Sequence, residues 1–371
     1  MLKTHNNHIH LKRNISIDYK VHFTKDVFDC SPNNQLSQLC QDKKALVIID
    51  HNVESLYGPE ITKFFSSQNI DYKIITNNAN ENQKDISSAI KICKVAQNFG
   101  IKRDSFFIAI GGGITMDIVG LAAALYRRKI SYIRIPTTLV GLIDAGVGIK
   151  VGVNLDESKN LLGHYYAPHS VFVDQSFLTT LTLTEIRCGL YEMIKMAIVR
   201  SDLLFSLIEE SYLDYLRKNF GEQTQQINYL SAQLMMEELE PNLHEHILER
   251  LVDFGHTFSP YIETSNNYSI LHGEAVGLDI LISTHIAFQR KILKETDFDR
   301  IINLAKAIGF SNKPLIEHQS LFNSLDDIRK HRAGNLNLVL PISTGSALFT
   351  NKCSESEIKK ALDFLSLEKF I

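Results

Sequence analysis

The chain reads FFIAIGGGITMD at residues 106–117, where a short apolar run passes directly into three glycines and then into a helical pattern. The apolar run predicts a buried strand, and glycines at a strand-to-helix turn allow the backbone to approach a pyrophosphate. The N–H groups and the positive dipole end of the helix would bind that anion. The alternative is a tight turn without a ligand, because the spacing is not the usual G-x-G-x-x-G.

Similar apolar runs at residues 45–50, 72–76 and 132–136 alternate with segments long enough for helices, such as 85–98. This alternation predicts a parallel sheet covered on both faces. Further along, residues 185–199, 223–238, 273–289 and 297–308 have helical patterns, and the next clear strand is at 337–341. We therefore predict a Rossmann-like α/β domain over residues 1–176 and a mostly α-helical domain over residues 177–371, with a cleft between them. A length of 371 residues is typical of two domains.

The composition excludes several classes of protein. A net charge of −3 gives no reason to expect a nucleic acid or an anionic membrane as partner. No apolar run approaches the roughly 20 residues that span a bilayer, and the first residues lack a secretory signal. The five cysteines are scattered and form no CxxC, which indicates reduced thiols in a cytoplasm.

Three residues are candidate metal ligands. Glu192 lies in GLYEMIK, with Lys195 on the same helix face, His256 lies in DFGHTF, and His272 lies in LHGEA. Two imidazoles and a carboxylate with an open position are typical of catalytic zinc. The ligands are 64 and 16 residues apart, so spacing alone does not show that they meet. A single histidine is more often a hydrogen-bonded core residue than a ligand.

These segments together resemble the 3-dehydroquinate synthases of the sugar phosphate cyclase superfamily. The resemblance rests on GGGITMD at 111–117, PTTL at 136–139, DAGVGIK at 144–150, the Lys159-Asn160 pair, EMIK at 192–195, GHT at 255–257 and HGEAV at 272–276. They occur in the family's order with near-family spacing over roughly residues 45 to 345. The fold that this implies is an NAD-binding α/β domain followed by an α-helical metal-binding domain, which agrees with the pattern above.

The departures from that family are informative. The arginine that helps hold a substrate carboxylate is replaced by Glu249, and the asparagine before the first histidine by Asp253. An upstream family lysine falls on Met235, and the second histidine of G-H-x-x-x-H is Pro260. An acid at the arginine position would repel a substrate carboxylate.

The replacements resemble the cyclases of sedoheptulose 7-phosphate, a sugar that lacks a carboxylate. LYRR at 125–128, GLID at 141–144, GHTFSP at 255–260 and KHRAG at 330–334 favour the 2-epi-5-epi-valiolone synthase branch. The 2-epi-valiolone and desmethyl-4-deoxygadusol synthases are alternatives within that group. A 3-dehydroquinate synthase, and then a metal-dependent polyol dehydrogenase of the glycerol dehydrogenase type, are more distant ones.

The resemblance implies the chemistry and its residues. NAD would oxidise one hydroxyl of the sugar phosphate, phosphate would leave by β-elimination, the hydride would return, and an intramolecular aldol would close the ring. Zinc or cobalt at Glu192, His256 and His272 would polarise the oxygens involved. The catalytic candidates are Lys150, Lys195, Asp144, Asn160, Arg128, Lys330 and Asp253. The candidates for NAD binding are Asp50, Glu81, Lys84, Gly111, Gly112, Gly113, Asp117, Thr137, Thr138 and Lys159.

Some of these assignments have a simpler alternative. Asp50 is equally suited to cap the helix that follows it. For Arg128, Lys159 and Lys330 the alternative is a solvated surface charge, and for Glu81 and Lys84 an exposed pair. The resemblance also implies that the chain forms a homodimer. It implies a small sugar phosphate as the substrate.

Overall fold

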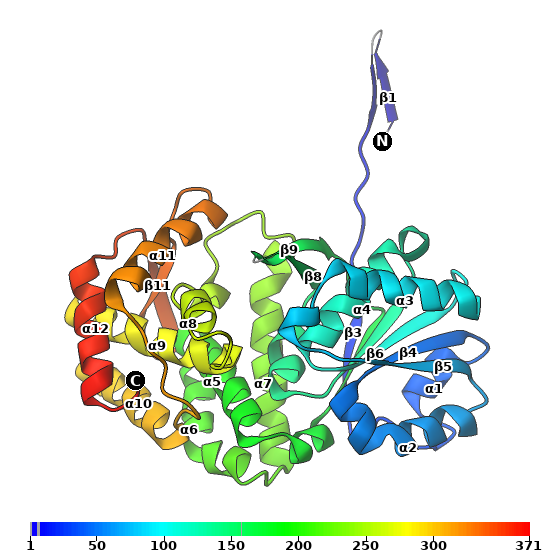
Figure 1. Cartoon of the computed structure of the whole chain (residues 1–371), viewed down its shortest axis with the longest axis horizontal. Coiled ribbons are helices and arrows are strands. Elements are labelled where there is room, and N and C mark those ends of the chain that lie inside the picture. Colours follow the sequence, from blue (N-terminus) through cyan, green and yellow to red (C-terminus); the bar gives the residue numbers. More distant parts are fainter. Residues whose placement is uncertain (1, 6–7, 157) are drawn as a thin grey trace.

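A six-stranded parallel sheet forms the centre of the first half of the chain (Figure 1). The structure is a computed structural model that describes residues 2–5, 8–156 and 158–371. The strand order is β3-β10-β7-β6-β4-β5. The strands are β3 Lys20–Thr24, β4 Lys44–Asp50, β5 Asp71–Asn77, β6 Phe106–Gly111, β7 Tyr132–Pro136 and β10 Ser170–Asp174. The prediction of a parallel α/β sheet is confirmed, and β3 and β10 extend it beyond the four strands that the sequence indicated.

Helices cover both faces of this sheet (Figure 1). On one side lie α1 Gln35–Cys40 and α2 His51–Ser67, and on the other lie α3 Ile86–Phe99 and α4 Gly113–Leu125. Alternate residues of β4 enter different cores because successive side chains of a strand point to opposite faces. Val47 packs in one cluster with Phe64 of α2, and Ile48 packs in another with Ile92 of α3.

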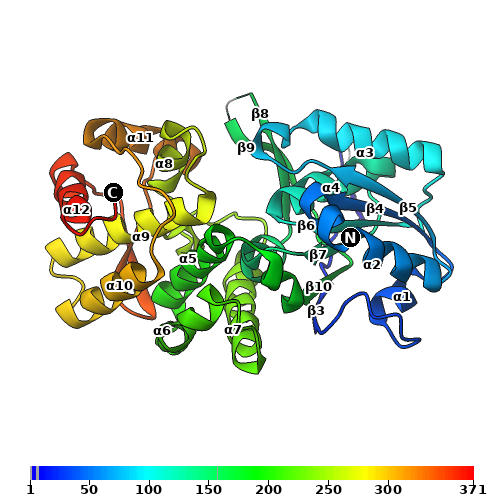
Figure 2. The same ribbon diagram turned by 60° about the horizontal axis from the view of Figure 1, so that its bottom comes forward.

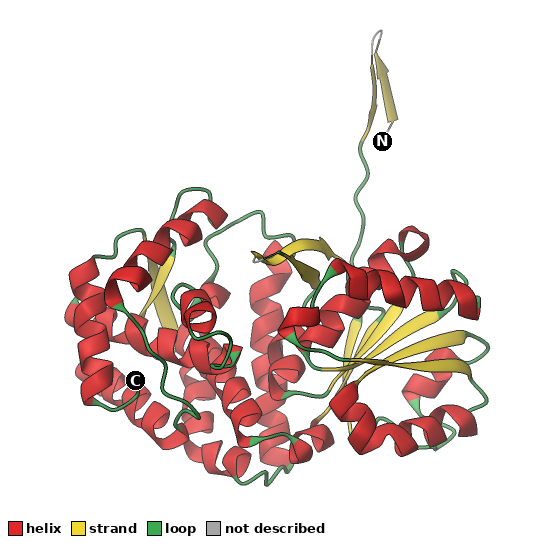
Figure 3. Cartoon of the chain, viewed as in Figure 1, coloured by secondary structure: helices red, strands yellow, loops and turns green. Residues whose placement is uncertain are grey.

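The second half of the chain is mainly helical (Figure 3). Its helices are α5 Leu183–Arg200, α6 Asp202–Leu216, α7 Glu222–Leu239, α8 Ser259–Ser265, α9 His272–Gln289, α10 Glu295–Ile308, α11 His318–His331 and α12 Glu355–Leu367. A short antiparallel hairpin, β11 Leu338–Ser343 and β12 Ser346–Thr350, packs against α9 and α5. The predicted fold class is therefore confirmed. Within the described residues, none of the helices combines the length and apolar character needed to cross a bilayer.

A second hairpin, which the sequence patterns did not indicate, joins the two halves. Strands β8 Lys150–Leu155 and β9 Ser158–Tyr165 pair antiparallel and lie between the α/β half and the helical half (Figures 1 and 2). A hairpin at the N-terminus, β1 Leu2–His5 with β2 His8–Leu11, stands away from the rest of the chain (Figure 1). Short helical turns complete the fold: η1 Glu81–Gln83, η2 Tyr126–Arg128, η3 Gly141–Ala145, η4 Gln175–Thr180, η5 Glu240–Asn242 and η6 Leu251–Asp253.

Two glycines of α9 let this helix lie directly against α5. A Cβ on Gly273 would lie 2.3 Å from Cα of Cys188, and a Cβ on Gly277 would lie 2.6 Å from the ring of Tyr191. Real Cβ atoms do not approach other atoms this closely, so any larger residue would force the helices apart. Gly273 directly follows His272, and Cys188 lies one turn before Glu192.

One buried arginine organises the loop after β7. Arg134 is fully buried, and its guanidinium donates to the carbonyl oxygens of Ala145, Gly146, Gly148 and Lys150, at distances from 2.6 to 3.3 Å. A loop wrapped around a rigid planar donor group has little freedom to move. Arg134 therefore fixes the segment between the candidate residues Asp144 and Lys150.

We expect Gly273→Ala to lower the free energy of unfolding by about 3 kcal/mol, because the new methyl group meets the α5 backbone. Gly58→Ala in α2 is the matched control, since its Cβ would meet only Cγ of Glu54 at 3.4 Å. The control should change stability by less than about 1 kcal/mol. Urea denaturation measures both, and equal effects would contradict the packing argument.

We expect Arg134→Met to lower the free energy of unfolding by about 3 to 5 kcal/mol, because four carbonyl groups of the loop lose their common donor. Arg134→Lys should fall between the wild type and the methionine variant, because an ammonium group offers fewer donors than the guanidinium. Equilibrium unfolding in urea gives the comparison. A methionine variant as stable as the wild type would show that Arg134 does not hold the loop.

Candidate active site

The three candidate metal ligands meet at one point. Glu192 lies in the middle of α5, His256 follows the η6 turn, and His272 is the first residue of α9. One ligand atom from each lies within 4.8 Å of the others. Oε1 of Glu192 is 3.2 Å from Nε2 of His272 and 3.7 Å from Nε2 of His256. The structure thus brings together three residues that are far apart in the sequence.

Both histidines are oriented by a partner on their other ring nitrogen. Nδ1 of His256 lies 3.0 Å from the carbonyl oxygen of Phe254, and Nδ1 of His272 lies 3.1 Å from Oε1 of Glu263. Such partners fix the ring and leave Nε2 free to bind a metal. Gly255 has a φ of +75° and makes the turn that brings the ring of His256 back to the carbonyl oxygen of Phe254.

Buried charges surround Glu192. Its side chain is 1% exposed, and that of Lys195 is 2% exposed. Nζ of Lys195 lies 2.6 Å from Glu192 and 2.8 Å from Oδ2 of Asp144, which belongs to the other half of the chain. Among the described residues, none gives either oxygen of Glu192 a well-aligned hydrogen bond. The carboxylate therefore has capacity left for a cation.

The protonation states follow from these contacts. Burial alone would lower the pKa of Lys195, but Asp144 and Glu192 raise it above its usual value. Burial and the nearby Lys195 lower the pKa of His256 to about 4. Burial also opposes charge on His272, but Glu192 and Glu263 raise its pKa to about 10. Without a metal, a neutral His256 therefore lies beside a protonated His272.

The glycine turn and its neighbours lie at the carboxyl edge of the sheet. Gly111 ends β6 opposite Pro136 of β7, and the N–H of Thr137 donates to the carbonyl oxygen of Gly111 at 2.9 Å. A Cβ on Gly111 would lie 3.0 Å from Cβ of Asp50. The edge thus collects Asp50, Gly111, Gly112, Gly113, Thr137 and Thr138. Asp50 also caps α2, since it accepts a hydrogen bond from the N–H of Asn52.

The other candidate cofactor residues form a second group beside the hairpin. Nζ of Lys84 lies 2.6 Å from Oδ2 of Asp117 and 2.6 Å from Oδ1 of Asn160. Nζ of Lys159 lies 3.8 Å from Oε1 of Glu81. Asn160, assigned to the substrate from the sequence, therefore shares a contact with the cofactor candidates.

Lys150 and Asp253 belong to a line of alternating charges. Lys150 lies 2.9 Å from Glu245, Glu245 pairs with Arg250, and Nη2 of Arg250 lies 2.6 Å from Oδ1 of Asp253. Arg332 approaches the other oxygen of Asp253 at 3.6 Å. The catalytic candidate Asp253 is therefore paired with Arg250 within this chain. Glu249, at the position of the family arginine, is exposed.

Two predicted catalytic residues do not join the others within this chain. Arg128 is exposed and follows the C-terminal end of α4, about 20 Å along the helix from the glycine turn. It therefore lies towards the opposite edge of the sheet. The side chain of Lys330 is 76% exposed and pairs with Asp327 on the outer surface of α11. The alternative interpretation of both as solvated surface charges fits this placement.

Other residues support the site although they were not among the candidates from the sequence. Glu263 contacts His272, and Arg332 donates to the carbonyl oxygen of His256 at 3.3 Å. Asp279 of α9 accepts hydrogen bonds from three successive N–H groups after His256, at residues 257–259. Arg332 lies in the family-like segment KHRAG, and Arg134 stands out as a charge within the apolar strand YIRIP.

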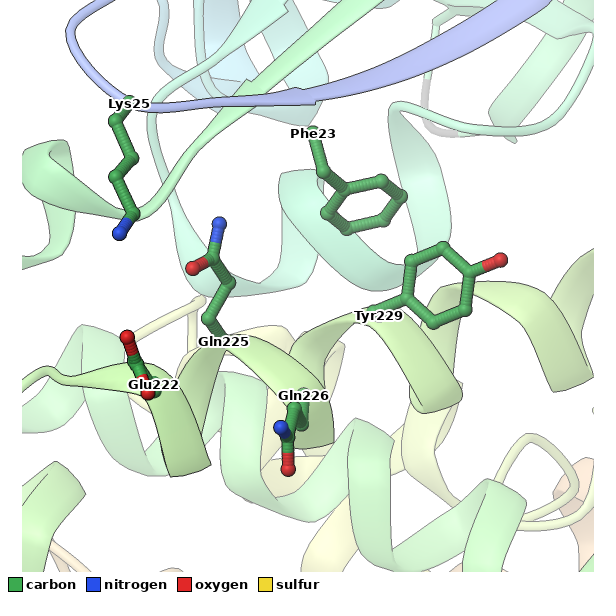
Figure 4. Close-up of a pocket in the computed structure, with 6 residues that line it drawn as sticks. All are labelled: Phe23, Lys25, Glu222, Gln225, Gln226 and Tyr229. Carbon is green, nitrogen blue, oxygen red and sulfur yellow. The ribbon is translucent and has the colours of Figure 1, made fainter.

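One surface hollow lies away from all of these residues. It has a volume of about 360 Å³ and lies between β3 and α7, where Phe23 and Tyr229 face each other (Figure 4). Its other lining residues are Lys25, Glu222, Gln225 and Gln226. None of the candidate site residues lines it, so its size does not mark the active site.

Comparison with known proteins agrees with this geometry. The family model described as 3-dehydroquinate synthase N-terminal matches residues 74–188, and the one described as 3-dehydroquinate synthase C-terminal matches residues 189–331. A 2-epi-5-epi-valiolone synthase of Streptomyces albus is 37% identical over 95% of this chain and 89% of that protein. A demethyl-4-deoxygadusol synthase of Trichormus variabilis is 34% identical over 95% of this chain and 88% of that protein.

A solved structure is similar over the whole chain. The 2-epi-5-epi-valiolone synthase from Streptomyces hygroscopicus subsp. jinggangensis 5008, with NAD⁺ and Zn²⁺ bound, matches with a TM-score of 0.92 and 34% identity. The match covers 97% of this chain and 99% of that one. The chain therefore belongs to the 3-dehydroquinate synthase family of sugar phosphate cyclases.

Proposed function

We propose that the chain is a 2-epi-5-epi-valiolone synthase that cyclises sedoheptulose 7-phosphate and releases phosphate. The observation that carries the proposal is the convergence of Glu192, His256 and His272 on the ion pair between Lys195 and Asp144, where the two halves of the chain meet. Relatives named for this activity, 34% and 37% identical over nearly the whole chain, support the specific product.

The residues fit a divalent metal and a nucleotide. Two Nε2 atoms face a buried carboxylate that has acceptor capacity left, and the three glycines place bare backbone at the carboxyl edge of the sheet. Zinc or cobalt at Glu192, His256 and His272 would polarise the reacting oxygens, and NAD at the sheet edge would take up and return one hydride. Because the hydride returns to the same molecule, the reaction needs no external oxidant.

The remaining roles fall to side chains of this chain. Lys195 stays protonated between two carboxylates and can donate to a substrate oxygen beside the ligands. Asp144 binds Lys195 through Oδ2, which leaves Oδ1 for a substrate hydroxyl. Lys150, whose side chain is 60% exposed, is our assignment for the substrate phosphate, with Asn160 as a neutral partner.

We also propose how the chain is organised. Residues 1–176 form the NAD-binding domain and residues 177–371 the metal- and substrate-binding domain, since β10 ends at Asp174 and α5 begins at Leu183. The resemblance to the family supports a homodimer. The cysteines form no disulfide in the described part of the chain, which fits a cytoplasmic enzyme.

We expect His272→Ala to lose bound zinc and cyclase activity while the α/β half stays folded, because one of three protein ligands is removed. His318→Ala, at the surface of α11, is the control and should keep full metal. Elemental analysis of the purified proteins gives the stoichiometry. Stoichiometric metal in the His272 variant would show that the ligand set is wrong.

We expect turnover of sedoheptulose 7-phosphate and negligible turnover of 3-deoxy-D-arabino-heptulosonate 7-phosphate. The second sugar's carboxylate would find Glu249 where the family has an arginine, and a pairing with Arg250 would require it to displace Glu245 or Asp253. Such a mismatch costs several kcal/mol, on the order of a thousandfold in selectivity.

Parallel phosphate-release assays test this selectivity. Efficient conversion of the carboxylated sugar to dehydroquinate would overturn the proposal in favour of a 3-dehydroquinate synthase. Product stereochemistry by NMR separates 2-epi-5-epi-valiolone from 2-epi-valiolone and demethyl-4-deoxygadusol. Net formation of NADH would instead indicate a polyol dehydrogenase.

A further inference from the structure

A row of contacts joins the hairpin β8–β9 to a candidate metal ligand of the other half. Nζ of Lys159 on β9 lies 2.8 Å from Oε2 of Glu263 on α8, and Oε1 of Glu263 lies 3.1 Å from Nδ1 of His272. Lys159 also lies 4.6 Å from the centre of the Tyr268 ring. Through Lys159 the hairpin therefore contacts two side chains of the helical half, Glu263 and Tyr268, and Glu263 touches a candidate metal ligand.

The same hairpin is held from its other side by candidate nucleotide residues. The side chain of Asn154 donates to Oε1 of Glu81 at 2.9 Å, and its N–H donates to the carbonyl oxygen of Lys84 at 2.8 Å. Lys84 in turn donates to Asn160, and Glu81 lies 3.8 Å from Lys159. The hairpin thus contacts the segment 81–84 directly, and it reaches the candidate ligand His272 through Glu263.

Burial makes the pair of Lys159 and Glu263 more than an ordinary surface ion pair. Exposed pairs contribute little, because water and salt screen them. The side chain of Glu263 is only 7% exposed, and its two oxygens serve two different partners. Loss of either partner leaves a buried carboxylate poorly compensated, so the two contacts depend on each other.

We propose that Lys159 and Glu263 couple the binding of the metal to the binding of the nucleotide, an inference that rests on the proposed function. A metal on His272 fixes its ring, the ring fixes Glu263, and Glu263 fixes Lys159 and the hairpin. A nucleotide held by segment 81–84 orders the same hairpin from the other side. Whichever group binds second finds the hairpin already ordered, so each strengthens the binding of the other.

Calorimetric titration of NAD⁺ into metal-free and zinc-loaded protein tests the link. In the wild type we expect zinc to tighten NAD⁺ binding roughly tenfold or more. In Glu263→Gln and in Lys159→Met, the NAD⁺ affinity with zinc should be within about twofold of the affinity without zinc. The readout is the ratio of the NAD⁺ affinities with and without zinc, because Glu263 also pairs with the NAD-binding candidate Lys159. If Glu263→Gln does not fold, Lys159→Met alone still decides the question.

Two further measurements make the test specific. Zinc titrations with and without NAD⁺ must give the same coupling factor, because coupling is reciprocal. Glu263→Gln should also weaken zinc binding about 10- to 100-fold and change the visible spectrum of the cobalt-loaded protein. Glu368→Gln, which breaks an ion pair with Lys306 between α10 and the C-terminal end of α12, is the control and should keep the wild-type coupling factor.

The outcomes separate the link from the proposed function. If the wild type binds both groups but zinc leaves NAD⁺ affinity unchanged, the link is wrong and the proposed function stands. A coupling factor that survives both substitutions also overturns the link. A wild-type chain that binds neither zinc nor NAD⁺ overturns the proposed function, and the link with it.

Discussion

The close contact between α5 and α9 is the constraint on which the rest of the site depends. It exists because residues 273 and 277 have no side chain, so that Cys188 and Tyr191 occupy the space where a Cβ would be. Glu192 lies one turn after Cys188, and His272 lies one residue before Gly273. The distance between a carboxylate and an imidazole from different helices is therefore set by backbone packing. A rigid scaffold of this kind holds ligands more precisely than loops do.

Charge organises the space around that contact. Asp144, Lys195, Glu192, His272, Glu263 and Lys159 form a line in which each group lies beside one of opposite sign. A buried ion such as Lys195 is tolerable only with such partners, because the cost of removing it from water is several kcal/mol. The line begins and ends in the α/β half and passes through the helical half. The two halves are thus joined by the same groups that are candidates for catalysis.

The sequence predicted the elements whose periodicity is strong and missed those without one. The four apolar runs became β4 to β7, because strands buried on both faces are continuous apolar segments. The hairpin β8–β9 was missed, since β9 is largely exposed and begins with polar residues. The convergence of Glu192 with His256 and His272 was not visible in the spacing, and only the family resemblance suggested it.

The occurrence of a residue in a family motif also did not show whether its long side chain points into the site or into solvent. Arg128 and Lys330 occur in segments shared with the family, yet both lie on the surface of this chain. Two residues after Lys330, Arg332 reaches the backbone of His256. Successive side chains of a helix point in directions about 100° apart. A difference of two residues can therefore decide whether a side chain points into the cleft or into solvent.

On the proposed function, substrate selectivity would come from arginines that already have partners. Arg250 and Arg332 are the guanidinium groups near Asp253, and a carboxylated substrate would need one of them as a partner. Arg250 is held by Glu245 and Asp253 together, while Arg332 donates to backbone carbonyls and to Thr257. A substrate carboxylate would have to break these contacts and leave a buried acid unpaired, whereas a hydroxyl can add to them as donor and acceptor. In the proposed enzyme this network would therefore favour a polyhydroxylated sugar, because hydroxyls can add to its contacts and a competing acid would have to break them.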